Sequence, residues 1–131
     1  MLDRSRIDNL AFALLRIVAG TMFAFHGGQK LFGLLTHKPG PALWSQKWAG
    51  GVIELVGGAL IALGLFARPA AFIASGMMAV AYFQFHWKLE GGERIFPIVN
   101  GGELAVIYCF VFLLIAARGA GILSIDRMRG H

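Results

Sequence analysis

Residues 50–87 read GGVIELVGGALIALGLFARPAAFIASGMMAVAYFQFHW, two apolar runs separated by Ala67-Arg68-Pro69 alone. Proline is tolerated in the first turn of a helix because its missing N–H would be unpaired there in any case. Pro69 therefore predicts the start of a new helix. We expect two apolar helices here, at about residues 49–66 and 69–87, joined by a tight turn.

Two further apolar segments flank this stretch, at about residues 10–33 and 98–117. A helix needs about 20 mostly apolar residues to cross the hydrocarbon layer of a bilayer. The chain of 131 residues is 57% hydrophobic and only 15% charged, with a mean hydropathy of +0.68. The sequence therefore predicts one membrane domain over residues 1–131, an all-α, up-and-down, integral membrane bundle of four helices.

Charge supports a membrane surface as the partner of this chain. The formal net charge is +5, but the basic residues are scattered and form no cluster, which argues against nucleic acid. With four spans both termini share one face, which carries seven Lys and Arg residues, counting Arg16, against five opposite. Because basic residues favour the cytoplasmic side, we expect cytoplasmic N- and C-termini. The single cysteine, Cys109, excludes an internal disulfide.

Polar side chains gather at the non-cytoplasmic end, where the ends of spans one and three meet the starts of spans two and four. Carboxylates within a span are costly, so a polar site is expected there. Two glutamates and two histidines are the candidate catalytic residues: Glu54, Glu103, His26 and His86. The candidate binding residues are Arg16, which lies nearer the cytoplasmic end, and Gln29, Lys30, Gln84 and Asn100.

Several interpretations of these residues remain open. The glutamates are either protonated or paired with a cation such as Lys30. Arg16 either snorkels to the headgroups, forms a structural salt bridge, or has a role in a substrate or proton path. A metal site is not expected, since no ExxH or HExxH spacing is present. Aromatic residues either face lipid and core or line a quinone or lipid pocket. They are Phe23, Phe25, Tyr82, Phe83, Phe85, Phe96 and Tyr108.

The sequence also contains two short internal repeats. Residues 23–26 (FAFH) match residues 83–86 (FQFH), and residues 50–55 (GGVIEL) match residues 101–104 (GGEL). These matches favour two similar helical hairpins related by an axis along the membrane normal. Small residues at four-residue spacing, such as Gly58 with Ala62, are expected to bring the second and third helices together. Such faces also favour a homo-oligomer.

Longer stretches resemble the DoxX family of small bacterial and archaeal membrane proteins over nearly the whole chain. They are residues 15–20 (LRIVAG), 26–33 (HGGQKLFG), 54–58 (ELVGG), 63–66 (LGLF), 78–83 (MAVAYF) and 100–105 (NGGELA). The resemblance implies a multi-pass protein of the bacterial or archaeal inner membrane and a subunit of a quinone- or thiol-linked oxidoreductase system. The sequence holds no motif for the usual electron carriers, so we expect no covalently bound cofactor and a redox role that uses quinone or an extracytoplasmic partner protein.

Three functions compete on these grounds. In the first, Glu54 and Glu103 relay protons in a quinone-linked redox subunit, and His26 or His86 hydrogen-bonds the reduced substrate or the ligand, which is a quinone or a lipid-like molecule. In the second, the chain is a non-catalytic membrane anchor or assembly partner. In the third, it is a small transporter, which the apparent repeat suggests.

Overall fold

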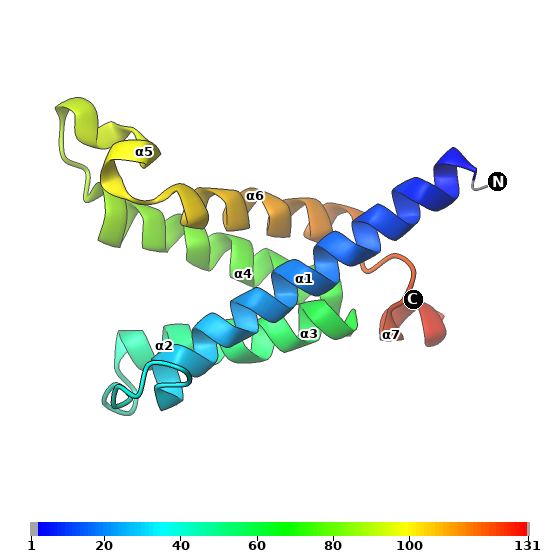
Figure 1. Ribbon diagram of the computed structural model, residues 1–131, viewed down its shortest axis with the longest axis horizontal. Helices are drawn as coiled ribbons and strands as arrows, with labels where there is room; N and C mark the ends of the chain where they lie inside the picture. Colours follow the sequence, from blue (N-terminus) through cyan, green and yellow to red (C-terminus); the bar gives the residue numbers. More distant parts are fainter. Residues whose placement is uncertain (1–2, 131) are drawn as a thin grey trace.

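The computed structural model describes residues 3–130 of the chain. Within that range the secondary structure is helical and contains no strand, so the prediction of an all-α protein is confirmed. The long helices lie in two pairs that diverge toward one end of the molecule (Figure 1).

The first helix, α1, covers Arg4–Phe32 and begins earlier than the sequence suggested. Asp3 explains the early start, because its carboxylate accepts hydrogen bonds from the backbone N–H of Ser5 (3.0 Å) and from the Ser5 hydroxyl (2.8 Å). The same two bonds hold the pKa of Asp3 below its ordinary value. Among the described helices, α1 alone is long and apolar enough in one unbroken α-helical run to cross a bilayer.

The second long helix runs without a break over residues 46–63 but changes its winding midway. It consists of α2 (Gln46–Val52), a π-helical segment η1 (Ile53–Gly57) and α3 (Gly58–Leu63). The hydroxyl of Ser45 caps its start by accepting from the N–H of Trp48 at 3.1 Å. The helix ends at Gly64, whose φ of 68° lies in the left-handed region that glycine adopts without strain.

The third long helix follows after the short turn that the sequence predicted. It consists of α4 (Ala67–Ala81) and a second π-helical segment, η2 (Tyr82–Trp87). Pro69 lies in the first turn of this helix, where proline is tolerated because a backbone N–H would have no partner within the helix.

The fourth apolar segment is interrupted. A 3-10 turn, η3 (Gly92–Ile95), leads to the short helix α5 (Pro97–Asn100), and the chain then breaks at Gly101, where φ is 75°. The main helix α6 covers Glu103–Arg118, so it starts later than the expected residue 98. A short helix, α7 (Ile125–Met128), follows near the C-terminus.

The first and second long helices pack where glycines let their backbones meet. α1 packs against α2, η1 and α3, while α4 packs mainly against α6. A Cβ atom added to Gly20 would lie 2.8 Å from the carbonyl oxygen of Gly58, so these two backbones touch. The expectation that Gly58 joins the second and third helices was therefore wrong, because its small surface is used by α1. In the other pair, the Ser75 hydroxyl donates to the carbonyl of Cys109 at 2.7 Å.

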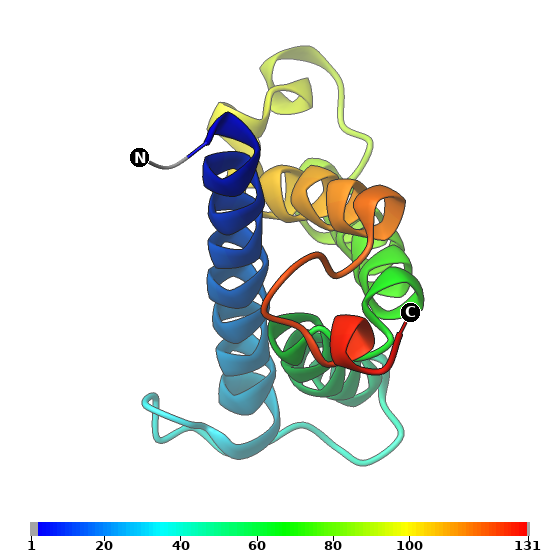
Figure 2. The ribbon, with the colours of Figure 1, turned by 90° about the vertical axis from the view of Figure 1, so that its right-hand side faces the viewer.

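One end of the molecule is held together by the C-terminal segment, and we call it the closed end. There the Asp126 carboxylate accepts from the N–H groups of Phe66 and Ala67, both at 2.9 Å, and so caps α4. Arg16 of α1 donates to the carbonyl of Leu123 at 2.7 Å, and Arg68 of α4 donates to the last carbonyls of α6. Figure 2 shows the C-terminal segment crossing from α6 toward α3 at this end. The opposite end, where the pairs diverge, is the open end.

Candidate functional site

A cleft of about 880 Å³ lies between the two helix pairs toward the open end. Both pairs contribute to its walls: α1, α2 and η1 from one, α4, η2 and α6 from the other. Most of the lining is apolar, including Phe23, Met77, Met78 and Leu104. Its volume is within the range of small-molecule sites, which are mostly apolar with a few fixed polar groups.

The wall of the cleft contains an ion pair between Lys30 of α1 and Glu54 of η1, and Lys47 of α2 lines the cleft as well. The Lys30 Nζ lies 2.5 Å from Glu54 Oε1, and the side chains are 39% and 3% exposed. Of the alternatives for Glu54, the structure shows pairing with a cation. Glu54 belongs to a π-helical segment, a deviation from α-helical winding that often accompanies functional sites.

Two buried polar atoms at the cleft have no hydrogen-bond partner among the described residues. They are the second carboxylate oxygen of Glu54, Oε2, and the phenol oxygen of Tyr108. Glu54 is 2% exposed and Tyr108 is 5% exposed, and both side chains line the cleft. A buried polar group without a partner costs about 1–3 kcal/mol, so these atoms gain from a ligand that supplies the missing hydrogen bonds.

Rigid aromatic packing positions Tyr108. Its ring stacks on Phe112, one turn further along α6, at 5.3 Å between centroids. The His26 ring meets Tyr108 edge-on, with centroids 6.1 Å apart and an interplanar angle of 89°. Phe23 packs against both Tyr108 and Phe112, at 5.3 and 4.7 Å. The phenol is therefore held in place at the cleft by an aromatic core.

Four of the candidate catalytic and binding residues come together at the cleft: His26, Lys30, Glu54 and His86. Three of the candidate aromatic residues line it as well: Phe23, Phe85 and Tyr108. His86 arrives from η2, the second π-helical segment, so each pair contributes one such segment to the walls. Within residues 3–130, no group of three or more His, Cys, Asp or Glu side chains is arranged to hold a metal ion.

The remaining sequence candidates lie elsewhere. Glu103 is exposed in the first turn of α6 and Gln29 is half-buried, and neither lines the cleft. Gln84 forms a reciprocal amide pair with Gln46 on the surface, with distances of 2.7 and 3.2 Å. Arg16 lies ten residues before His26 on α1, about 15 Å nearer the closed end, where it binds the C-terminal segment.

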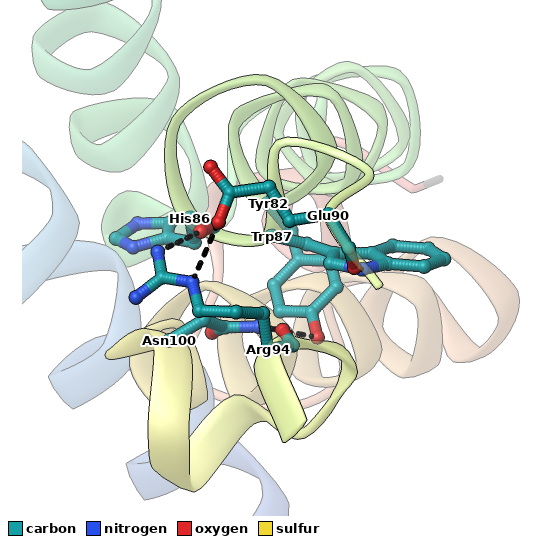
Figure 3. A network of polar contacts seen from close by, with 6 residues as sticks. All are labelled: Tyr82, His86, Trp87, Glu90, Arg94 and Asn100. Carbon is teal, nitrogen blue, oxygen red and sulfur yellow. Dashed lines mark hydrogen bonds and ion pairs between the residues drawn. The ribbon is translucent and has the colours of Figure 1, made fainter. Parts of the chain in front are cut away.

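Asn100 belongs to the loop before α6 and does not itself line the cleft. Figure 3 shows the polar network around it. Its amide donates to the Tyr82 hydroxyl (3.0 Å) and the Arg94 carbonyl (2.9 Å), and its side-chain oxygen accepts from the Gly102 N–H (2.9 Å). Arg94 in turn pairs with Glu90 at 3.1 Å. This network fixes the connection between η2 and α6, so Asn100 acts as a structural residue.

Sequence reasoning missed the two methionines of the cleft and the particular position of Tyr108. Met77 and Met78 were indistinguishable from other apolar residues of their helix. Tyr108 was one of several aromatic candidates for a ligand pocket, but nothing in its neighbours marked its hydroxyl as buried and unpaired. The hydroxyl itself was the available signal, because a tyrosine within a long apolar run needs a polar partner.

The fold is that of a small all-α protein, and its two helix pairs border a mostly apolar cleft with an ion pair in its wall. The DoxX family model matches residues 11–87, and the chain belongs to the DoxX family. A protein of Haemophilus influenzae, described as uncharacterized, is 44% identical over 128 residues, covering 95% of this chain and 93% of that protein. No solved structure matches the chain. DoxX proteins are typically membrane-associated, which agrees with the apolar length of α1.

Proposed function

We propose that the chain is a multi-pass protein of the inner membrane in which all four long helical segments span the bilayer. The support is the distribution of apolar side chains, since large hydrophobic residues point outward along every segment. Leu14 and Val18 of α1 are 50% and 53% exposed, Phe72 of α4 is 67% exposed and Phe110 of α6 is 64% exposed. Such a surface is stable against lipid and unfavourable in water.

Helix length and charge agree with this proposal. At 1.5 Å per residue, residues 46–63, residues 67–87 and α6 reach about 27, 31 and 24 Å, close to the thickness of the hydrocarbon layer. Arginines gather at the closed end, which points to a cytoplasmic closed end and cytoplasmic termini. These arginines are Arg68, Arg118, Arg127 and Arg129.

We further propose that the cleft binds a quinone or a similar lipid-soluble ligand, as part of a quinone- or thiol-linked redox system. The observation that carries this proposal is the pair of buried, unpartnered oxygens of Glu54 and Tyr108 beside a mostly apolar wall. A quinone head group needs a few hydrogen bonds and an apolar surface for its ring and tail, so the residues present fit it.

The chain's own residues supply the proton chemistry of such a site. A bound quinone brings two-electron redox chemistry, in which proton transfer accompanies electron transfer. The carboxylate of Glu54 and the imidazoles of His26 and His86 are groups at the cleft that can accept or release a proton, and Lys30 stabilises the negative charge on Glu54. Phe23 and the methionines keep water away from the ring. Glu103, which is exposed on α6, is not part of this relay.

A substitution that fills the cleft tests the proposal. Ala49 lines the cleft and is exposed, so Ala49→Trp should fold while obstructing the site. We expect at least a tenfold loss of affinity for decylubiquinone and decylubiquinol in lipid nanodiscs, measured by calorimetry. Ala59→Trp is the matched control, because Ala59 is exposed on α3 and does not line the cleft.

Two outcomes would contradict the proposal. If neither redox form binds the wild-type protein, the chain is not a quinone-binding subunit, and the anchor hypothesis takes its place. If Ala49→Trp binds as tightly as Ala59→Trp, the ligand binds somewhere other than this cleft.

A redox partner outside the membrane belongs to the same proposal. The loop between α1 and α2 exposes Leu43 and Trp44, which are 71% and 83% exposed, at the open end. Trp44 also packs on Trp48, with ring centroids 4.8 Å apart. Aromatic anchors of this kind are typical of protein interfaces and of membrane headgroup layers. Trp44→Ala should weaken partner binding and leave quinone affinity in nanodiscs unchanged.

A further inference from the structure

We propose that the cleft selects the reduced, hydroxyl-bearing form of its ligand, a hydroquinone, over the oxidised dicarbonyl form. This inference rests on the proposed quinone site and adds the redox state that the site prefers. It depends on the hydrogen-bonding roles of the two unpartnered oxygens, Glu54 Oε2 and the Tyr108 hydroxyl.

Glu54 Oε2 can only accept a hydrogen bond. Its other oxygen, Oε1, lies 2.5 Å from the Lys30 ammonium, and an ion pair requires the carboxylate form. An ionised carboxylate has acceptor oxygens and no proton to donate. With the side chain 3% exposed, water has little access to Oε2, so a ligand must bring a donor to this position.

The Tyr108 hydroxyl can donate or accept, and it suits either redox form. A quinone carbonyl accepts from it, and a hydroquinone hydroxyl accepts from it equally well. The two forms differ at Glu54. A hydroquinone O–H can donate to Oε2, whereas a carbonyl placed there would set two acceptors against each other in an environment with little water.

Lys30 does not reverse this preference. Its ammonium could donate to a carbonyl, but it already contacts Glu54, and its side chain is 39% exposed. Its remaining N–H groups are therefore within reach of solvent, and they gain less from a ligand than a buried atom does. His26 can present either a donor or an acceptor nitrogen, so it favours neither form.

The test compares decylubiquinol with decylubiquinone, two probes that share ring substituents and tail. Affinity is measured anaerobically by calorimetry with the full chain in nanodiscs, and partitioning into empty nanodiscs is subtracted. One hydrogen bond to a charged group corresponds to about tenfold or more in affinity, so decylubiquinol should bind at least about tenfold more tightly.

Two variants connect the preference to the named atoms. Glu54→Gln offers an amide that can donate or accept, so the preference should fall below about threefold. Tyr108→Phe removes a group that serves both forms, so both affinities should fall while their ratio stays near the wild-type value. Glu103→Gln, an acid-to-amide change on the exposed start of α6, should change neither affinity nor ratio.

The wild-type ratio decides the inference even if Glu54→Gln fails to fold. Equal binding of the two forms, or tighter binding of the quinone, would overturn it and leave the quinone site intact. A preference that survives in Glu54→Gln would also overturn it, because another group would then be the acceptor. Failure of both probes to bind would instead remove the proposed function.

Discussion

The contact between α1 and α3 depends on two glycines, and adding a single methyl group to either tests it. A Cβ atom at Gly58 would lie 2.6 Å from the carbonyl oxygen of Gly20 and 2.8 Å from the Cα atom of Ala24. The backbone nitrogen of Ala24 is nearer still. Ordinary contacts of a Cβ begin near 3.4 Å. Both neighbours belong to a helix backbone, so neither can turn aside as a side chain would.

Gly58→Ala must therefore push α1 and α3 apart by at least about 0.8 Å, the difference between 2.6 and 3.4 Å. Overpacking of this kind typically costs about 1–3 kcal/mol, and a backbone neighbour places the expected loss toward the upper part of that range. The measurement is the free energy of unfolding in mixed detergent micelles, followed by circular dichroism. Ligand affinity should also fall, because Glu54 and Lys30 lie on the two helices that move.

Gly57→Ala is the matched control. It changes the neighbouring residue, where an added Cβ meets nothing within 4 Å and φ is −61°. Alanine loses less backbone entropy than glycine on forming a helix, so Gly57→Ala should be neutral or stabilise by up to about 1 kcal/mol. Equal stability of the two variants would refute the packing of α1 on α3.

Two further predictions concern hydrogen bonds outside the cleft, one set at the closed end and one in the loop before α6. Asp126→Ala removes both hydrogen bonds that cap α4, so the free energy of unfolding should fall by about 1–3 kcal/mol, whereas Asp126→Asn, which keeps one acceptor oxygen, should lose about half as much. An unchanged melting temperature in Asp126→Ala would contradict this cap. Asn100→Ala should speed hydrogen exchange over residues 88–102 while leaving quinone affinity within about twofold of wild type, because its bonds join the loop and not the cleft. The control is Asn9→Ala, because Asn9 is exposed. A large loss of quinone affinity in Asn100→Ala would contradict the prediction and show that Asn100 belongs to the site.

Local signals in the sequence located the helices well. Hydropathy marked the apolar segments, and Pro69 marked the turn between residues 63 and 67. The boundaries shifted where a single side chain or glycine decided them. Asp3 moved the start of α1 toward the N-terminus, and Gly101 delayed the start of α6. Hydropathy averages over many residues, so it cannot resolve a cap or a left-handed turn.

The candidate site was only partly predictable. The sequence placed His26, Lys30, Glu54 and His86 at one end of the molecule, and the cleft unites them. It also grouped Glu103 with Glu54, because both follow a Gly-Gly pair, yet Glu54 is buried and Glu103 is exposed. The matching motifs open helices that differ in winding and in partner, since Glu54 follows a continuous helix and Glu103 follows a break at Gly101. A short motif does not specify which face of its helix is covered.

The sequence by itself determined that this chain is helical and apolar, where its helices lie and which family it belongs to. These properties follow from composition, periodicity and local motifs, and they need no knowledge of distant contacts. Only the tertiary structure decided that α1 takes α3 as its partner, that Arg16 binds the C-terminal segment, and that Glu54 and Tyr108 share a cleft with one oxygen each left unpaired. Each of these features depends on how helices far apart in the chain pack and rotate against one another. Hydropathy indicates which residues avoid water, but it does not indicate which side chains those residues contact.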